Sequence, residues 1–177
     1  MQTIQEILSL YQNDPRLQQL GSLIQLQQQR IHLKGLIGSS DALLTIALHA
    51  LTEQAFIFVL PTYEEAVYFL NDIENISGKP GLLFPASYRK PFEFIQPDSG
   101  NVLLRAEVLN EIKSKSRLSK FIATYPEALA EKVISRETLE KNTLDIKVND
   151  KLSIEFINEF LHEYAFERVD FVYEAGQ

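Results

Sequence analysis

The fold class is read most directly from residues 39–78, "SSDALLTIALHALTEQAFIFVLPTYEEAVYFLNDIENISG". The first part has serines before a long run that is apolar nearly all round, which predicts a buried helix. "AFIFVLP" is a continuous apolar run, typical of a strand buried on both faces of a parallel sheet. "TYEEAVYFLNDIENISG" has helical spacing between a threonine and a closing Gly78, which predicts a capped amphipathic helix.

The same alternation of strand and helix extends on both sides of this stretch. Before it, "IHLKGLIG" reads as a short strand ending in Gly38, and residues 2–29 read as two helices separated by Asp14-Pro15. After it come the predicted strand "GLLFP", the helix "NVLLRAEVLNEIKS", the strand "KFIATYP" and the helix "PEALAEKV". This order predicts an α/β layer fold around a parallel sheet, with residues 1–131 as one domain that includes the N-terminal helices.

Residues 132–177 differ in character and are expected to form a small α/β domain. "NTLDIKVND" alternates Leu144, Ile146 and Val148, which predicts a half-exposed strand. "SIEFINEFLHEYAF" predicts a helix capped by Ser153, and "ERVDFVYEAGQ" begins a further strand. Because that strand stops abruptly at Gln177, we expect the small domain to be truncated and to depend on the larger one for stability.

Composition excludes several classes of protein. The chain has 177 residues and a net charge of −7, so it lacks the overall basic character of a nucleic-acid binder. It has no cysteine, which excludes disulfides, thiolate metal sites and cysteine nucleophiles. No run approaches the roughly 18 apolar residues of a membrane span, so a soluble cytoplasmic protein without membrane contact is expected.

"GLIGSSDALL", residues 35–44, has the outline of a phosphate-binding loop between a strand and a helix. When the pattern G-x-x-x-x-G-K-[ST] is laid on Gly35, Ser40 takes the place of the second glycine. Asp41 then stands where the lysine belongs, and Ala42 where the magnesium-binding hydroxyl belongs. At about 4 Å and an effective dielectric constant near 20, exchanging the cation for a carboxylate changes a pair energy from about −4 to about +4 kcal/mol. No aspartate follows directly on a predicted strand to hold magnesium either.

A structural role explains these residues better than nucleotide binding. Gly35 and Gly38 can form a tight turn, and Ser39 or Ser40 can cap the following helix. Asp41 in the first turn would meet the positive end of the helix dipole, a contribution of roughly 0.3–1 kcal/mol. We therefore interpret the loop as a degenerate P-loop, with a working nucleotide site and a chance resemblance as the alternatives.

Several stretches together resemble the N-terminal region of the bacterial transcription-repair coupling factor. The resemblance covers the chain from about Leu33 onward and depends on the combination and order of its segments. These are "GLIGSSDALL", "LPTYEEAVYFLNDIEN", "LLFPASYRKPFEFIQPDSGNVLLRAEVLN", "TYPEALAEKVISRETLEKNTLDIKVNDKLS" and "YAFERVDFVYEAGQ".

The resemblance implies a helicase-type α/β domain with a small inserted α/β domain, like the first two domains of the excinuclease B subunit. In that family, the domain that resembles excinuclease B has lost its ATPase motif, so no enzyme activity and no cofactor are expected here. ATP and magnesium would serve the translocase motor of the full-length parent. The implied role is an adaptor whose small domain docks onto the excinuclease A subunit and is masked by the parent's own C-terminal domain. RNA polymerase and DNA would be bound through other domains.

The resemblance also implies docking residues in the small domain. Lys151 stands where the family has a basic residue at the partner surface, and Arg168 matches an arginine of the A-subunit interface in excinuclease B. Glu167 and Asp170 flank that arginine. The structural alternative is that Arg168 and Asp170 form only a solvated charge pattern, worth under about 1 kcal/mol.

Two other features support weaker hypotheses. The stretch from Tyr88 to Phe94 interleaves bases with aromatics, as nucleic-acid grooves do, but two basic residues release few counterions. A packed connecting loop is the favoured interpretation, and a DNA-binding fragment is the alternative. His32, His49 and His162 have no metal-ligand spacing, so no metal site is expected. The remaining rival is an active small P-loop NTPase.

Overall fold

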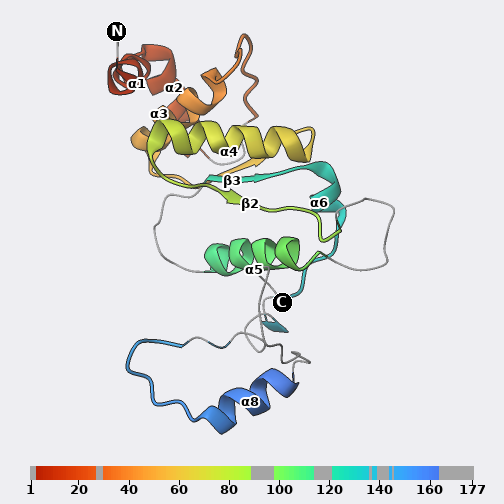
Figure 1. The fold of residues 1–177 in the computed structure, drawn as a ribbon. Coiled ribbons are helices and arrows are strands. Elements are labelled where there is room, and N and C mark those ends of the chain that lie inside the picture. Colours follow the sequence, from red (N-terminus) through yellow and green to blue (C-terminus); the bar gives the residue numbers. More distant parts are fainter. Residues whose placement is uncertain are drawn as a thin grey trace.

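The computed structural model describes residues 3–26, 30–88, 98–113, 121–135, 137–138, 144 and 146–163, and all structural statements below concern these residues. They form a mixed α/β fold in which helices flank a small parallel sheet (Figure 1). The elements are α1 (Ile4–Gln12), α2 (Pro15–Gln25), α3 (Ser40–Thr52), β1 (Phe56–Val59), α4 (Tyr63–Ser77), β2 (Leu82–Leu83), α5 (Ser99–Lys113), β3 (Phe121–Thr124), α6 (Pro126–Ala130) and α8 (Ile154–Glu163).

The N-terminal helices form where the sequence predicts them. Thr3 and Glu6 make a reciprocal capping box at the start of α1. Asp14 caps α2 by accepting the amide hydrogen of Arg16 at 2.8 Å, and Pro15 occupies the first helical position. Leu17 and Leu20 of α2 are buried with Ala47 and Leu48 of α3. This cluster fastens the helical pair to the rest of the fold.

The sheet has the strand order β1-β3-β2, and both strand pairs are parallel. Phe56 is in register with Phe121 and Val59 with Thr124, while Leu82 and Leu83 pair with the other side of β3. Helix α4 connects β1 to β2 on one face of the sheet, and α5 connects β2 to β3 on the other (Figure 1). These are two β-α-β crossovers, as the alternating pattern predicts.

The prediction that β1 is buried on both faces is wrong. Ile57 and Val59 are 61% and 55% exposed, and only Phe56 and Phe58 face the core. Phe58 packs against Phe69 of α4, so Ile57 and Val59 point to the opposite face, where α5 packs against β2 at the other edge of the sheet. The central strand is β3, whose four residues are all buried. A continuous apolar run is therefore compatible with an edge strand here.

The predicted strand at residues 31–38 is also absent. Residues 30–39 are all exposed and pair with no described strand. Gly35 has φ of 84°, a left-handed backbone conformation that interrupts an extended segment in its middle. Without a buried face or a neighbouring strand, nothing holds this segment in a sheet.

The main core lies between the sheet and the helices on both faces. Ala66, Phe69 and Ile73 of α4 meet Phe84, Phe121 and Ala123 of the strands and their ends. Helix α4 begins at Thr62, whose hydroxyl accepts the amide hydrogen of Glu65 at 3.2 Å. It ends at Gly78, which has φ of 70° as a left-handed cap requires.

The part after residue 131 is only partly described. Helix α8 forms with Ser153 as its cap, because the Ser153 hydroxyl accepts the amide hydrogen of Phe156 at 3.0 Å. The predicted strand through Leu144, Ile146 and Val148 is not found among the described residues. Lys147 donates its amide hydrogen to the carboxylate of Asp150 at 2.8 Å, and residues 148 and 149 form a turn. None of the helices in the described part is long and apolar enough to cross a membrane.

Candidate functional site

The loop that precedes α3 is a tight turn rather than an open phosphate cradle. Gly35 and Gly38 have φ of 84° and 57°, conformations that glycine adopts without strain. The hydroxyl of Ser40 accepts the amide hydrogen of Ile37 at 2.7 Å. A phosphate-binding loop works through free backbone N–H groups. Here the chain's own side chain binds one of them.

The start of α3 uses a carboxylate instead of a serine cap. Ser39 occupies the cap position but makes no side-chain hydrogen bond to the helix, and Ser40 bonds backwards to Ile37. The predicted capping by one of these serines is therefore wrong. Asp41 accepts the amide hydrogen of Ala42 at 2.7 Å. A carboxylate in the first turn stabilises the positive end of the helix dipole, which is the role that the sequence predicts for Asp41.

Ala42 lies inside the packed core. Its exposed fraction is 0%, and it belongs to the same cluster as Ile46 and Ala66. The corresponding position of a working P-loop carries a hydroxyl that binds magnesium. A buried methyl group offers no ligand atom, and its surroundings are apolar. The start of α3 therefore has neither the lysine nor the hydroxyl that a working P-loop carries at these two positions.

A cleft of about 530 Å³ lies next to this loop, between it and helices α1 and α2. Leucines from α1, α2, α3 and the segment before α3 line it, together with the mutually bonded pair Asp14 and Arg16. Arg16 Nη2 lies 2.6 Å from Asp14 Oδ2. The side-chain hydrogen bond from Arg16 is the largest cause that lowers the pKa of Asp14 to about 2. These two charges pair with one another at the start of α2, where Asp14 caps the helix.

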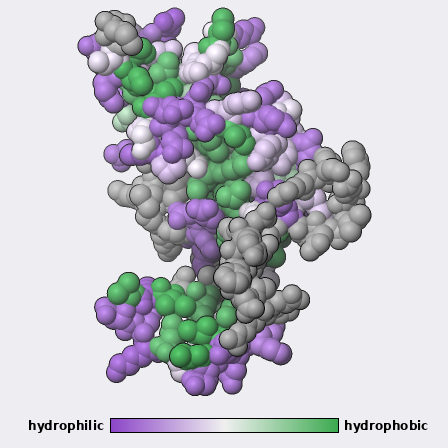
Figure 2. All heavy atoms as spheres, in the orientation of Figure 1, coloured by the Kyte–Doolittle hydropathy of each residue, from purple (hydrophilic) through white to green (hydrophobic). Residues whose placement is uncertain are grey.

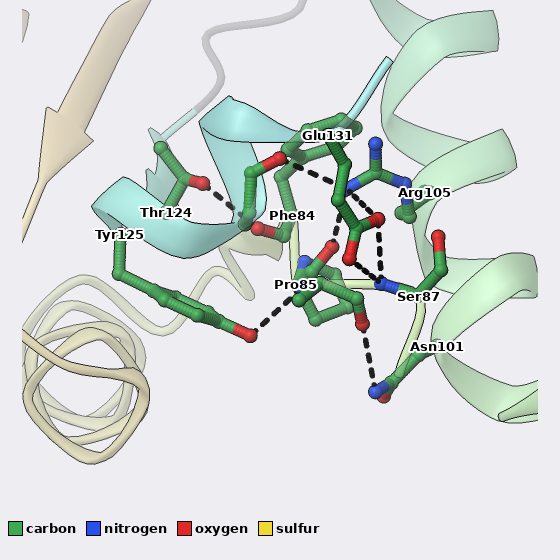
Figure 3. A network of polar contacts seen from close by, with 10 residues as sticks. Phe84, Pro85, Ser87, Asn101, Arg105, Thr124, Tyr125 and Glu131 are labelled. Carbon is green, nitrogen blue, oxygen red and sulfur yellow. Dashed lines mark hydrogen bonds and ion pairs between the residues drawn. The ribbon is translucent and has the colours of Figure 1, made fainter. Parts of the chain in front are cut away.

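A second group of polar residues was not singled out from the sequence. It lies where the chain leaves the carboxyl ends of β2 and β3, the edge at which open parallel sheets bind ligands (Figure 3). Thr124 donates its hydroxyl hydrogen to the carbonyl of Phe84 at 2.8 Å. Asn101 of α5 donates from Nδ2 to the carbonyl of Ala86 at 2.9 Å. The segment after β2 is therefore bonded to both β3 and α5.

Arg105 is the buried cation of this group. Its exposed fraction is 6%, and its Nη1 donates to the carbonyls of Pro85 at 2.7 Å and Ala128 at 3.2 Å. The guanidinium carbon lies 4.2 Å from the centre of the Phe84 ring. Burial lowers the pKa of Arg105, and the nearby carboxylate of Glu131 opposes that shift. The one sequence signal is a single arginine within the apolar run "NVLLRAEVLN".

Glu131 completes the network at the end of α6. Both of its oxygens accept the amide hydrogen of Ser87, at 3.0 and 2.9 Å, and Oε2 lies 3.5 Å from Arg105 Nη1 (Figure 3). Within the guanidinium, Nη1 is bonded to carbonyls of the chain, whereas the buried Nη2 has no hydrogen-bond partner in the described part of the chain. The arrangement holds the segment after β2, helix α5 and the end of α6 together.

The docking residues expected from the resemblance are only partly described. Lys151 is exposed and lies just before α8, in a position where a partner could reach its ammonium group. Arg168, Glu167 and Asp170 lie outside the described residues. The same is true of the stretch proposed for DNA contact from Arg89 to Phe94, while Tyr88 is described and half-buried.

Helix α8 carries an apolar stripe that is not covered by the described part of the chain. None of its residues is buried, and Ile154, Phe156 and Leu161 are 74%, 44% and 36% exposed. Figure 2 shows hydrophobic side chains gathered over this helix. Exposed apolar surface next to charged residues is typical of a protein-binding surface. Lys151 stands at the beginning of this stripe.

The three histidines lie in different segments of the chain. His49 bonds through Nδ1 to the carbonyl of Gln54 at 2.9 Å and packs edge-on against Phe121. His32 lies in the exposed segment before α3 and His162 on α8. Among the described residues, no group of three histidine, aspartate or glutamate side chains is placed to hold a metal ion.

No known protein family, curated protein or solved structure matches the chain.

Proposed function

We propose that the chain is a non-catalytic protein-interaction module of a transcription-repair coupling factor. It recruits the A subunit of the nucleotide-excision-repair excinuclease to RNA polymerase stalled at a lesion. The full-length parent is an ATP-dependent DNA translocase that displaces the polymerase in the cytoplasm, and its motor lies outside the present sequence. The α/β body is of the helicase type, and its segment from residue 132 onward is the docking domain.

The proposal rests on the side chains of Asp41 and Ala42 at the start of α3. The carboxylate of Asp41 is bonded to the amide of Ala42, and Ala42 is fully buried in the core. A nucleotide would need a cation and a hydroxyl at these two places. Their replacement by a capping carboxylate and a packed methyl favours a scaffold over an ATPase. This agrees with the degenerate motif that the resemblance implies.

The exposed surface of the docking segment supports a protein partner. The apolar stripe of α8 begins beside Lys151, so apolar area and a positive charge occur together. Protein interfaces commonly combine an apolar centre with charged residues at the rim, where the charges guide association. The resemblance places Arg168 in the same surface, next to Glu167 and Asp170.

The direct test is a binding titration of the chain with the purified excinuclease A subunit, measured by isothermal titration calorimetry or fluorescence anisotropy. The wild-type chain is expected to bind saturably. Lys151→Glu and Arg168→Glu are each expected to weaken binding about tenfold or more, as interface anchors do. Lys79→Glu, an exposed lysine between α4 and β2, makes the same charge change on the body and serves as the matched control.

The outcomes separate the proposal from its rivals. Equal weakening by Lys79→Glu would indicate a general charge effect instead of a docking surface. Absence of binding by the folded wild-type chain would overturn the recruitment role. Retention of the chain on duplex DNA at about 150 mM salt would instead favour a DNA-binding fragment.

A further inference from the structure

Strand β1 directs the backbone groups of two residues away from the sheet. Among the described strands it pairs only with β3, in the order β1-β3-β2. Leu60, which directly follows β1, donates its amide hydrogen to the carbonyl of Thr124 at 2.8 Å. In a parallel ladder, alternate residues of a strand direct both of their backbone groups to the same neighbour. Phe58 and Leu60 therefore face β3, whereas the amides and carbonyls of Ile57 and Val59 face outward.

The described part of the chain gives these outward groups no hydrogen-bond partner. Beyond the pairing with β3, no backbone hydrogen bond of Ile57 or Val59 is found among the described residues. Their side chains are 61% and 55% exposed, on the face of the sheet opposite α4. The same two residues thus present unpaired backbone groups together with uncovered apolar surface. An edge of this kind is a template for a further strand.

The chemistry of this edge favours a second copy of the same strand. In an antiparallel pair, a two-fold axis at Phe58 sets Ile57 of one chain opposite Val59 of the other. Residues paired in this way exchange both of their N–H···O bonds, so the outward amides and carbonyls of both chains are matched at once.

The charge of the edge also permits self-pairing. Residues 55–61, "AFIFVLP", contain no charged side chain, so two copies meet there without like-charge repulsion although the net charge of each chain is −7. Natural edge strands commonly avoid self-pairing with a charge or a proline within the strand. The four residues of β1, "FIFV", have neither.

We propose that β1 pairs antiparallel with β1 of a second copy, so that two sheets join into one across a two-fold axis. Ile57 and Val59 of the two chains then form apolar cross-strand pairs on the face opposite α4. Because β1 is only four residues long, the contact is small and the dimer is weak. This surface does not include Lys151 or α8, so its test is independent of the proposed recruitment role.

Hydrogen exchange followed by NMR on the whole wild-type chain tests the pairing one amide at a time. As the protein concentration rises through the micromolar range to the millimolar range, the amides of Ile57 and Val59 should become roughly tenfold more protected. The amides of Phe58 and Leu60, which face β3, should change little. Sedimentation velocity on the same samples should show a matching shift from monomer to dimer.

Three variants test which surface holds the dimer. Val59→Pro removes an outward N–H and leaves the bonds to β3 in place, because proline is tolerated where a strand faces solvent. Ile57→Lys places a charge at the edge. Each should weaken dimerisation about tenfold or more. Leu10→Lys is the matched control, because Leu10 of α1 is also 61% exposed, and it should leave dimerisation unchanged.

Three results on the wild-type chain would overturn the pairing. One is a chain that stays monomeric up to millimolar concentration. Another is a dimer in which the amides of Ile57 and Val59 exchange as fast as in the monomer, since a different surface would then hold it. The third is protection of these amides at every concentration, because the edge would then be covered from within a single chain.

Discussion

The hydroxyl of Tyr125 accepts a hydrogen bond from the amide of Ala86 at 2.7 Å, across 39 positions of the sequence. Tyr125 directly follows β3, and Ala86 lies three residues after β2, so the bond joins the carboxyl ends of the two strands. Both residues are buried, at 7% and 8% exposure. The contact belongs to the network that includes Arg105 and Glu131. Substituting one residue of this network at a time therefore measures how much each contact stabilises this edge of the sheet.

Tyr125→Phe should destabilise the fold. The change removes only the oxygen, so the buried amide of Ala86 loses its acceptor, at a cost of about 1–3 kcal/mol in the free energy of unfolding. Urea denaturation followed by circular dichroism measures it. Tyr63→Phe is the matched control, because Tyr63 packs edge-on against Tyr125 but is 42% exposed. Equal losses in both variants would show that the Ala86 bond contributes nothing specific.

Stability should fall at alkaline pH because of the same residue. Burial raises the pKa of Tyr125 above its ordinary value of 10.0, while the hydrogen bond from the amide of Ala86 opposes that shift. The unfolded chain therefore releases the phenolic proton first. The stabilising contribution of the protonated Tyr125 side chain is fully present below a pH of 10.0 and is lost as the pH rises through the folded-state pKa. Urea midpoints measured across this range should decline less steeply in Tyr125→Phe than in the wild type.

Ala42→Thr should destabilise the protein without restoring a metal site. The position has no exposed surface, so the added methyl and hydroxyl groups must displace core neighbours, at a cost of about 1–3 kcal/mol. Ala42→Ser adds a smaller group and should cost less. Thermal unfolding monitored by circular dichroism gives both values. A threonine variant as stable as the wild type would show that the core around Ala42 has room for the added methyl and hydroxyl groups.

ATP with magnesium should not raise the melting temperature of the wild-type chain. A ligand that binds only the folded state stabilises it by an amount that grows with its concentration. The bonded Asp41 and the buried Ala42 leave no cation or hydroxyl for the phosphates. Differential scanning fluorimetry with millimolar ATP tests this. A saturable increase would contradict the scaffold interpretation and favour an NTPase.

Arg16→Ala should return the Asp14 carboxyl to ordinary acidity. The hydrogen bonds from the Arg16 side chain and amide lower the pKa of Asp14 from 3.8 to about 2. In the variant the side-chain bonds are lost, so the pKa should rise toward 3.8 while the amide bond remains. Carbon-13 NMR titration of the carboxyl group measures the change. In the wild type, the stabilising contribution of the ionised Asp14 carboxylate is present above a pH of 3.8 and is lost as the pH falls through about 2.

Local signals predicted three helix starts correctly, although the serine cap predicted for α3 is not formed. Thr62, Asp14 and Ser153 each start a helix as predicted, because a cap bonds an amide only two or three positions away. Gly78 ends α4 for a similarly local reason. The alternation of strands and helices predicted the parallel sheet. The strand predicted before α3 failed because strand formation needs a neighbouring strand, which local pattern does not reveal.

The residues of the candidate sites also differ in whether the local sequence reveals them. Asp41 and Ala42 could be recognised from a motif of fixed spacing, and their local roles follow from the helix that they begin. Arg105, Tyr125 and Glu131 were not recognised, because each is meaningful only beside a segment 20 to 44 positions away. A single arginine in an apolar helix was the one available signal.

The amino-acid sequence by itself determined the helices, most of their caps, the class of fold and the absence of a lysine and a hydroxyl at positions 41 and 42. These depend on contacts within one or two turns of the chain. Only the tertiary structure decided that β3 is the central strand, that β1 lies at an exposed edge, and that Glu131 bonds the segment after β2. The physical reason is that burial and long-range hydrogen bonds depend on which segments become neighbours, as residues 87 and 131 do across 44 positions of the sequence.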